Sequence, residues 1–176
     1  LAHKVRIPAF ITRLGSLTFI GNMGGYGSDF ASKGIFETGA GTANVALGIR
    51  RGRFSGRLET SGLNLRQIMD DEHWGVVSTR INVDGKIPNG TRNTLSGLDL
   101  NVKGIIQRFD YNGYSYRDLA VDGGLHKGIA EGRLSIKDAN ITADVKGKVS
   151  LNKGLQSANF LANVERLNPH ALGLTQ

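Results

Sequence analysis

Cysteine is absent from this chain, and proline and tryptophan are scarce. Its 176 residues include no Cys, three Pro and one Trp. The lack of cysteine excludes disulfides, thiolate metal sites, cysteine nucleophiles and iron–sulfur clusters, and the few prolines exclude a proline-rich linker. No apolar run reaches the roughly 18 residues of a membrane-spanning helix, and residues 1–20 lack the pattern of a signal peptide. We therefore expect any membrane anchor or export signal to lie outside this chain.

Glycine, by contrast, is abundant. The chain has 25 glycines among 176 residues, about twice the usual share, and they follow no collagen-like period. With 39% hydrophobic and 21% charged residues, the composition is that of a folded domain with many short turns. Because the chain starts at Leu1 rather than Met, we interpret residues 1–176 as a single segment of a larger protein.

The chain is basic, with a formal charge of +7 and an isoelectric point near 9.9. Such a balance suits nucleic acid, an anionic membrane surface or acidic lipid head groups as partners. The dense basic cluster is Arg50, Arg51, Arg53 and Arg57 around a glycine turn. It lacks the interleaved aromatics or the basic helix face typical of nucleic-acid-binding proteins, so we expect no nucleic-acid partner.

Apolar residues or glycines alternate with polar residues along much of the chain. This period of two is typical of strands with one buried face, and it recurs in segments 45–49, 77–83, 98–106, 119–125, 134–136 and 141–151. Dipeptides that favour tight hairpins lie between such segments: Arg51-Gly52, Asn89-Gly90, Asn112-Gly113, Lys127-Gly128 and Lys153-Gly154. The fold class is therefore mainly β, a long antiparallel meander of about nine strands.

Short helices are expected at three places. Asn64 is a candidate N-cap for a helical turn over residues 65–69, and Asn168 followed by Pro169 predicts another over residues 169–172. A third helix is expected over residues 8–14, with Gly15 at its C-terminal end. In the first two cases a strand leads through Leu-Asn into a helical turn, which is a weak internal repeat.

No motif of the chain predicts catalysis. The four histidines are far apart and never at the HxH or HxxxH spacing of a shared metal ion: His3, His73, His126 and His170. The acidic run 70–72 lacks the alternating oxygen ligands and closing Glu of a calcium loop. The glycine-rich stretch 21–27 is not a phosphate-binding loop and is interpreted as a strand end, and no GxSxG motif marks a nucleophilic serine. We expect no enzyme activity, no cofactor and no metal site.

Four aromatic residues flank the predicted turn Asn112-Gly113: Phe109, Tyr111, Tyr114 and Tyr116. Cross-strand aromatic pairs stabilise antiparallel hairpins. We therefore interpret this group as a structural hairpin cluster, and a stacking platform for a ligand is the alternative.

The apolar face of such a sheet cannot be left in water. Either a second layer covers it, or the sheet curls and the face lines a groove for apolar ligands such as acyl chains. Val, Leu, Ile, Ala and Gly dominate these faces, where a sandwich would place bulky aromatics, and this favours a curled or grooved sheet. The candidate lipid-groove residues are Val45, Leu47, Ile49, Phe54, Leu58, Val77, Ile81, Val83, Leu98, Leu100, Val102, Ile106, Leu119, Val121, Leu134, Ile136, Ile141, Val145, Val149, Leu151, Phe160 and Val164.

Several stretches carry a likeness to a known family. They are residues 17–21 with 26 and 29–31, residues 54–58 with 63–65 and the loop 71–75, residues 105–119, residues 122–123 and residues 132–138. The most distinctive is the pattern aromatic-Asp-Tyr-Asn-Gly-Tyr-x-Tyr over Phe109–Tyr116, followed by Leu119 and Asp122-Gly123. Over nearly its whole length the chain resembles the translocation and assembly module TamB of Gram-negative bacteria, in the form found in Bacteroidetes, within the AsmA-like superfamily.

The resemblance implies a long twisted sheet folded into a U-shaped, taco-like groove with a hydrophobic interior. It places the chain in the periplasm, in a protein anchored in the inner membrane by a part outside this chain. It implies phospholipid transport, with acyl chains as ligands, in support of outer-membrane assembly together with an outer-membrane partner of the Omp85 type. The alternative function is a structural or docking module that adds an edge strand from an outer-membrane client or partner protein.

Overall fold

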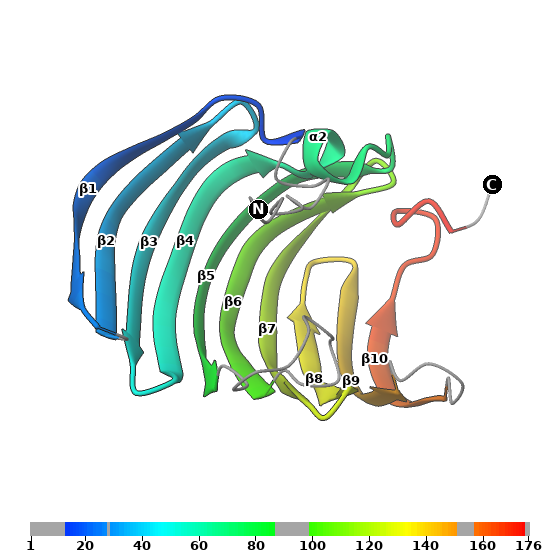
Figure 1. Ribbon diagram of the computed structural model, residues 1–176. Coiled ribbons are helices and arrows are strands. Elements are labelled where there is room, and N and C mark those ends of the chain that lie inside the picture. The colour runs from blue at the N-terminus through cyan, green and yellow to red at the C-terminus, as the bar shows by residue number, and fades with distance from the viewer. Residues whose placement is uncertain (1–12, 28, 87–98, 151–156, 175–176) are drawn as a thin grey trace.

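The computed structural model describes residues 13–27, 29–86, 99–150 and 157–174, and these residues form one antiparallel sheet of ten strands (Figure 1). Each strand pairs with the next one along the chain, from β1 at one edge to β10 at the other. The strands are β1 (Leu17–Tyr26), β2 (Asp29–Thr38), β3 (Gly41–Arg50), β4 (Arg53–Asn64), β5 (Trp74–Lys86), β6 (Asp99–Tyr111), β7 (Tyr114–His126), β8 (Ile129–Lys137), β9 (Ile141–Ser150) and β10 (Ala158–Leu167). A short helix, α2 (Leu65–Met69), connects β4 to β5.

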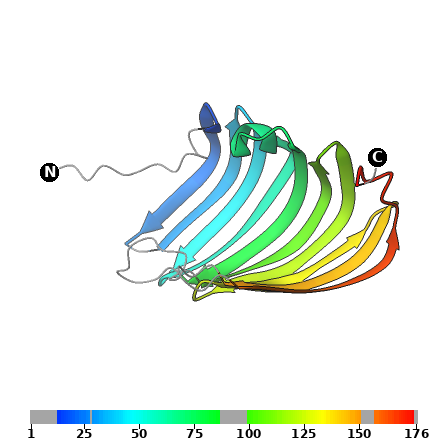
Figure 2. The same ribbon diagram turned by 90° about the vertical axis from the view of Figure 1, so that its right-hand side faces the viewer.

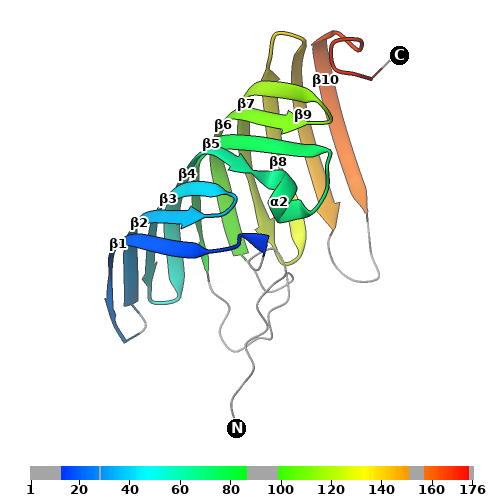
Figure 3. The same cartoon turned by 90° about the horizontal axis from the view of Figure 1, so that it is seen from above.

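The sheet is a single bowed layer, with strands that run side by side and bend along their length (Figures 2 and 3). It is not closed, because β1 and β10 remain its two separate edges. It is also not strongly curled, so the described residues do not show the curled, U-shaped groove expected from the sequence. The described residues form no second sheet against either face. The predicted mainly β antiparallel meander is confirmed, with ten strands rather than about nine. The glycine-rich stretch 21–27, expected only as a strand end, belongs mostly to the full strand β1.

Three of the predicted hairpin dipeptides form the tight turns expected of them. Positive φ angles occur at both residues of Arg51-Gly52 (49° and 72°), Asn112-Gly113 (50° and 80°) and Lys127-Gly128 (50° and 75°). Two consecutive positive φ angles define the type I′ turn, whose twist matches that of the strands it joins. The other two predicted turns, Asn89-Gly90 and Lys153-Gly154, lie outside the described residues.

The helix predicted after Asn64 is present as α2. Asn64 caps it with its side-chain oxygen, which accepts from the Gln67 N–H at 3.4 Å, and Asp70 ends it in a left-handed conformation at φ 58°. We call the end of the sheet that carries α2 the helix end, and the opposite end the far end.

The helix predicted after Asn168 is not present, whereas Arg13, in the helix predicted over 8–14, is helical and Gly15 follows it at φ 74°. After Asn168, whose side-chain oxygen accepts from the Ala171 N–H at 3.2 Å, the chain makes only turns. Gly173, at φ 67°, stops the helical path one turn after it starts, which explains why the predicted helix over 169–172 does not develop. Most of the predicted helix 8–14 lies outside the described residues. No helix in the described part of the chain is long and apolar enough to cross a membrane.

The hydrophobic core of this layer is thin. Five apolar residues of the described chain are buried: Ala40, Leu119, Leu125, Ala143 and Leu172. No large side chain of the described residues is fully buried, and every residue of β10 is exposed. The packing that holds the sheet is therefore lateral, between neighbouring strands, rather than between two layers.

A buried polar cluster at the helix end of the sheet joins the start of β7 to the turn between β8 and β9. The carboxylate of Asp138, which is 4% exposed, accepts hydrogen bonds from the Tyr114 hydroxyl and from the backbone N–H groups of Arg117 and Asn140, the last two at 2.9 Å. Burial by itself would raise the pKa of Asp138, but these hydrogen bonds outweigh it and hold the pKa below its usual value. The cluster therefore stabilises the ionised form.

Candidate functional site

The strand register divides the sheet into two chemically different faces. Alternate residues of all ten strands lie on one face, which we call the apolar face, in four rows that cross the whole sheet. Counted from the far end, the first row is Gly25, Phe30, Ile49, Phe54, Gly85, Leu100, Leu125, Ala130, Val149 and Ala158. The second is Met23, Ser32, Leu47, Gly56, Val83, Val102, Gly123, Gly132, Gly147 and Phe160.

The next two rows continue this face toward the helix end. The third row is Gly21, Gly34, Val45, Leu58, Ile81, Gly104, Val121, Leu134, Val145 and Ala162. The fourth is Phe19, Phe36, Ala43, Thr60, Thr79, Ile106, Leu119, Ile136, Ala143 and Val164. None of the four rows contains a charged residue. Their three polar residues are Ser32, Thr60 and Thr79, and the two threonine hydroxyls donate to the carbonyl oxygens of Val77 and Ile105 at 3.3 and 3.0 Å.

The structure brings the candidate groove residues together on this face. Eighteen of them belong to the four rows, and Val77 and Ile141 extend the same face toward the helix end, beside Phe109 and Leu167. Leu98 and Leu151 lie outside the described residues. The candidates come from eight strands, β3 to β10, so strand pairing gathers on one face residues as far apart in the chain as Val45 and Val164.

Three phenylalanines of this face were missed by the sequence reasoning: Phe19, Phe30 and Phe36. They lie on β1 and β2, and the rings of Phe19 and Phe36 are 4.9 Å apart. The alternation Phe30, Ser32, Gly34, Phe36 contains the signal that could have identified β2. Its small central residues weaken the apolar signal, because serine and glycine do not mark the period of two as clearly as branched side chains do.

Glycines on the apolar face occupy positions where no side chain fits. A Cβ atom on Gly104 would lie 2.2 Å from the Arg80 carbonyl oxygen, and one on Gly123 would lie 2.7 Å from that of Glu131. On the opposite face, a Cβ on Gly48 would meet nothing closer than 3.9 Å. Glycine is the residue that permits such a close approach of neighbouring backbones.

Three of these glycines form the floor of a hollow on the apolar face. The hollow, of about 530 Å³, lies over β6 to β10, and its floor is the glycine stretch of the second row: Gly123, Gly132 and Gly147. Larger residues of the first and third rows stand on either side, among them Leu100 and Leu134, and Phe160 closes the β10 side. The result is a shallow apolar channel that runs across the strands.

The opposite face, which we call the polar face, is stabilised by ion pairs between neighbouring strands. They are Arg80 with Glu59 at 2.9 Å, Lys103 with Asp122 at 2.7 Å, Arg133 with Asp144 at 2.6 Å and Lys148 with Glu131 at 3.3 Å. Hydrogen bonds from Arg133 and Ser135 lower the pKa of Asp144 to about 2. Hollows of about 930 and 1140 Å³ on this face lie among long polar and charged side chains.

The aromatic residues around Asn112-Gly113 form the hairpin cluster that the sequence predicted. The rings of Phe109 and Tyr116 are 6.2 Å apart across β6 and β7, and Tyr114 packs against Tyr116 at 4.8 Å. Trp74 of β5 joins the cluster, 5.7 Å from the Phe109 ring. Cross-strand contacts of this kind stabilise the helix end of the sheet.

Two of the four histidines, His73 and His126, have a carboxylate as a local partner. His73 Nδ1 lies 2.7 Å from Asp71 Oδ1, and hydrogen bonds from the His73 backbone and side chain lower the pKa of Asp71. His126 Nδ1 lies 2.5 Å from Asp99 Oδ1. Within the described ranges, no three His, Asp or Glu side chains gather as a metal site would require.

No protein-family model, no curated protein and no solved structure matches this chain. The resemblance to TamB therefore stays a prediction from the sequence. The apolar face, with its glycine-floored hollow, is the strongest candidate for a functional site.

Proposed function

We propose that the apolar face conducts lipid acyl chains, as part of a periplasmic protein of the TamB type that supplies phospholipid to the outer membrane and supports its assembly. The single observation that carries this proposal is the run of four uncharged rows that crosses all ten strands without a second sheet over them in the described chain. An extended uncovered apolar face normally marks a surface with a partner.

The energy of moving a lipid through water supports an acyl chain as that partner. Exposing each CH₂ group to water costs about 0.8 kcal/mol, so a lipid cannot readily cross an aqueous compartment alone. A continuous apolar surface keeps the chain out of water while the head group stays hydrated. Such a surface needs no catalytic group, and it works only if no charge interrupts it.

The size of the glycine-floored hollow also fits one acyl chain. It spans β6 to β10, which is about 19 Å at a strand spacing of about 4.8 Å. One leaflet of a bilayer has a hydrocarbon thickness of about 15 Å. An extended chain would therefore lie along the second row, with the side chains of the first and third rows on either side.

The proposal includes a U-shaped groove in the larger protein. The strands of this segment already bow in one direction (Figure 2), and both sheet edges, β1 and β10, are available for further strands. Because the twist and bend of a sheet accumulate from strand to strand, a longer sheet of the same kind would curl further than this one. Anchoring in the inner membrane, and pairing with an Omp85-type partner, would come from other parts of that protein.

Photo-crosslinking tests the proposal directly. We expect a photoreactive residue at Val121, on the third row, to crosslink to phospholipid added to the purified chain. The matched control is Ala120, the next residue of β7, which lies exposed on the polar face. Because adjacent strand residues point to opposite faces, the two positions differ in face and little else. Equal crosslinking at Val121 and Ala120, or none at Val121, would refute the proposal.

The exposed edge strand β10 favours a second function, docking by strand addition. Phe160 and Leu161 are 61% and 72% exposed, and a sheet edge presents unpaired backbone groups that can pair with another strand. Under this function an outer-membrane client or partner would add a strand beside β10. Native mass spectrometry separates the two: co-purified phospholipid supports conduction, and binding of a β-strand peptide without lipid supports docking.

A further inference from the structure

A group of four cations lines the far end of the sheet, and we call it the cationic rim: Arg50, Arg51, Arg53 and Lys86. Arg50 pairs in register with Arg53 across β3 and β4, and Arg53 pairs in turn with Lys86 of β5. Like charges placed directly opposite each other destabilise a sheet. Folding therefore gives no reason for this arrangement.

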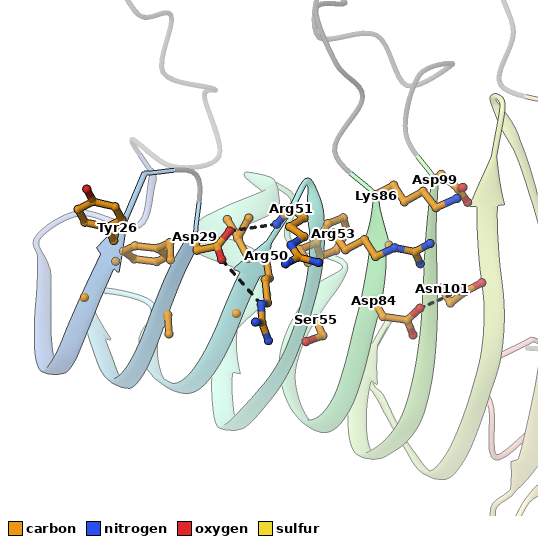
Figure 4. A pocket seen from close by; sticks show the side chains of 18 residues that line it. Tyr26, Asp29, Arg50, Arg51, Arg53, Ser55, Asp84, Lys86, Asp99 and Asn101 are labelled. Carbon is orange, nitrogen blue, oxygen red and sulfur yellow. Dashed lines mark hydrogen bonds and ion pairs between the residues drawn. The ribbon is translucent and has the colours of Figure 1, made fainter.

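The carboxylates near the cationic rim are already engaged. The rim borders a hollow of about 1020 Å³ whose acidic residues are Asp29, Asp84 and Asp99 (Figure 4). Asp29 lies 3.8 Å from Arg50 and accepts from the Arg51 backbone N–H at 3.1 Å. Asp84 accepts from the Asn101 amide at 3.0 Å, and Asp99 contacts His126 at 2.5 Å.

Three side chains of the cationic rim form no ion pair with these carboxylates, although Asp99 lies directly opposite Lys86 across β5 and β6. Among the described residues, Arg51, Arg53 and Lys86 form no ion pair through their side chains. The ranges that are not described, 1–12, 28, 87–98, 151–156 and 175–176, contain no Asp or Glu. The partner of these three cations is therefore to be sought outside this chain.

The cationic rim lies at the far edge of the sheet, where the two faces meet. Alternation along the strands places Arg50, Arg53 and Lys86 on the polar face, with Ser55 and Asp84 of the same hollow. Arg51 lies in the β3–β4 turn, beyond the last strand residue, and the first row of the apolar face ends beside that turn. Because the sheet is a single layer, a lipid whose tail lies on the first row could place its head group at the strand ends, beside the rim.

We infer that the cationic rim binds the phosphate of a lipid head group and makes the surface prefer anionic phospholipids over zwitterionic ones. The inference rests on the proposed function. Arginine and lysine are the usual phosphate-binding side chains, and the planar guanidinium of arginine can make two parallel hydrogen bonds to phosphate oxygens. The head group of an anionic lipid carries a net negative charge, which the cationic rim attracts. In a zwitterionic lipid the positive choline neutralises the negative charge of the phosphate, so the head group has no net charge.

Calorimetric titration with two short-chain lipids tests the inference. Dioctanoyl phosphatidylglycerol and dioctanoyl phosphatidylcholine, used below their micelle concentrations, share tails and differ in head-group charge. Each basic residue near an anionic lipid surface is worth about fivefold in affinity. We expect the chain to bind the glycerol lipid at least fivefold more tightly at low salt, and the preference to shrink at high salt because exposed charges are screened.

A charge-matched pair of variants locates the effect. R51Q/R53Q/K86Q should bind both lipids with the affinity of the choline lipid. The control K33Q/K137Q/K146Q removes three lysines that also form no ion pair among the described residues, and it should keep the preference. Melting curves of both variants confirm folding, and the rim variant should melt no lower, since facing like charges are removed.

Each outcome separates the two proposals. Equal affinity for both lipids, or a preference that the control variant loses as well, would overturn the head-group site and leave acyl-chain conduction standing. Binding of neither lipid by the unmodified chain would overturn conduction itself. Tighter binding of inorganic phosphate or of a short oligonucleotide than of the glycerol lipid would show an anion site without a lipid, and would overturn the inference too.

Discussion

The two faces of this sheet are built on different principles. The polar face pairs charges across neighbouring strands, as in Lys103 with Asp122, and each pair is exposed to solvent. The apolar face carries four uncharged rows, yet only a few of its residues, such as Leu119 and Leu125, are buried. A folded domain usually covers the apolar face of a sheet with a second layer of secondary structure. The surplus of uncovered apolar surface on one face thus indicates a role beyond folding.

The apolar face itself is uneven. Toward the helix end, the fourth row is closely packed, with Leu119 at 5% exposure. In the second row, glycines replace large side chains and leave the hollow over β6 to β10. Stability and ligand binding are therefore expected to depend on different rows.

The largest effect on stability is expected at the fourth row. Leu119→Ala should lower the free energy of unfolding by about 2–4 kcal/mol, because it removes buried methyl groups and leaves a cavity between Ile106 and Ile136. Urea unfolding followed by circular dichroism measures the change. Val102→Ala, on the half-buried second row, should cost clearly less, and equal losses at the two sites would show that the rows do not differ.

The next largest effect on stability is expected at the glycines of the apolar face, where neighbouring backbones approach closely. Gly104→Ala should cost about 1–3 kcal/mol, since its Cβ would lie 2.2 Å from the Arg80 carbonyl oxygen and the strands would have to move. Gly48→Ala, on the polar face with nothing closer than 3.9 Å, is the matched control and should be nearly neutral. Chemical denaturation of both variants measures the difference. An unchanged free energy of unfolding for Gly104→Ala would contradict the close backbone approach at this position.

A charge on the second row should separate ligand binding from stability. Val102→Asp is expected to cost only about 1 kcal/mol of stability, because an uncovered face lets water hydrate the carboxylate, whereas a sealed core would strand it at a cost of several kcal/mol. Binding of dioctanoyl phosphatidylcholine should be lost. Urea melts and calorimetry on the same samples give both values, and severe unfolding would mean that this face is sealed rather than open.

The smallest effect concerns the polar face and depends on pH. The pKa of Asp144 is about 2 in the folded chain and 3.8 for an unperturbed carboxyl, so its ion pair stabilises the fold fully above pH 4 and progressively less as the pH falls toward 2. Asp144→Asn should melt slightly below the unmodified chain at pH 6, and the two should converge near pH 2. A constant gap in melting temperature at all pH values would show that the charge of Asp144 is irrelevant.

The sequence by itself determined the local features of this fold. A period of two assigns residues such as Val45 and Leu47 to one face, because successive strand side chains alternate. Arg51-Gly52 predicts a tight hairpin, in which both residues adopt positive φ. Asn64 predicts the start of α2 as its N-cap. These features need only a few neighbouring residues, and each was predicted from the sequence.

Only the tertiary structure decided which residues meet across strands. The alignment of Gly123, Gly132 and Gly147 into one floor depends on the register of three strands, and register depends on every turn and bulge between them. The arginines at residues 50–53 were visible as a cluster in the sequence, but only the pairing of β4 with β5 brings Lys86 beside Arg53. Such contacts are absent from local patterns because they form between segments far apart in the chain.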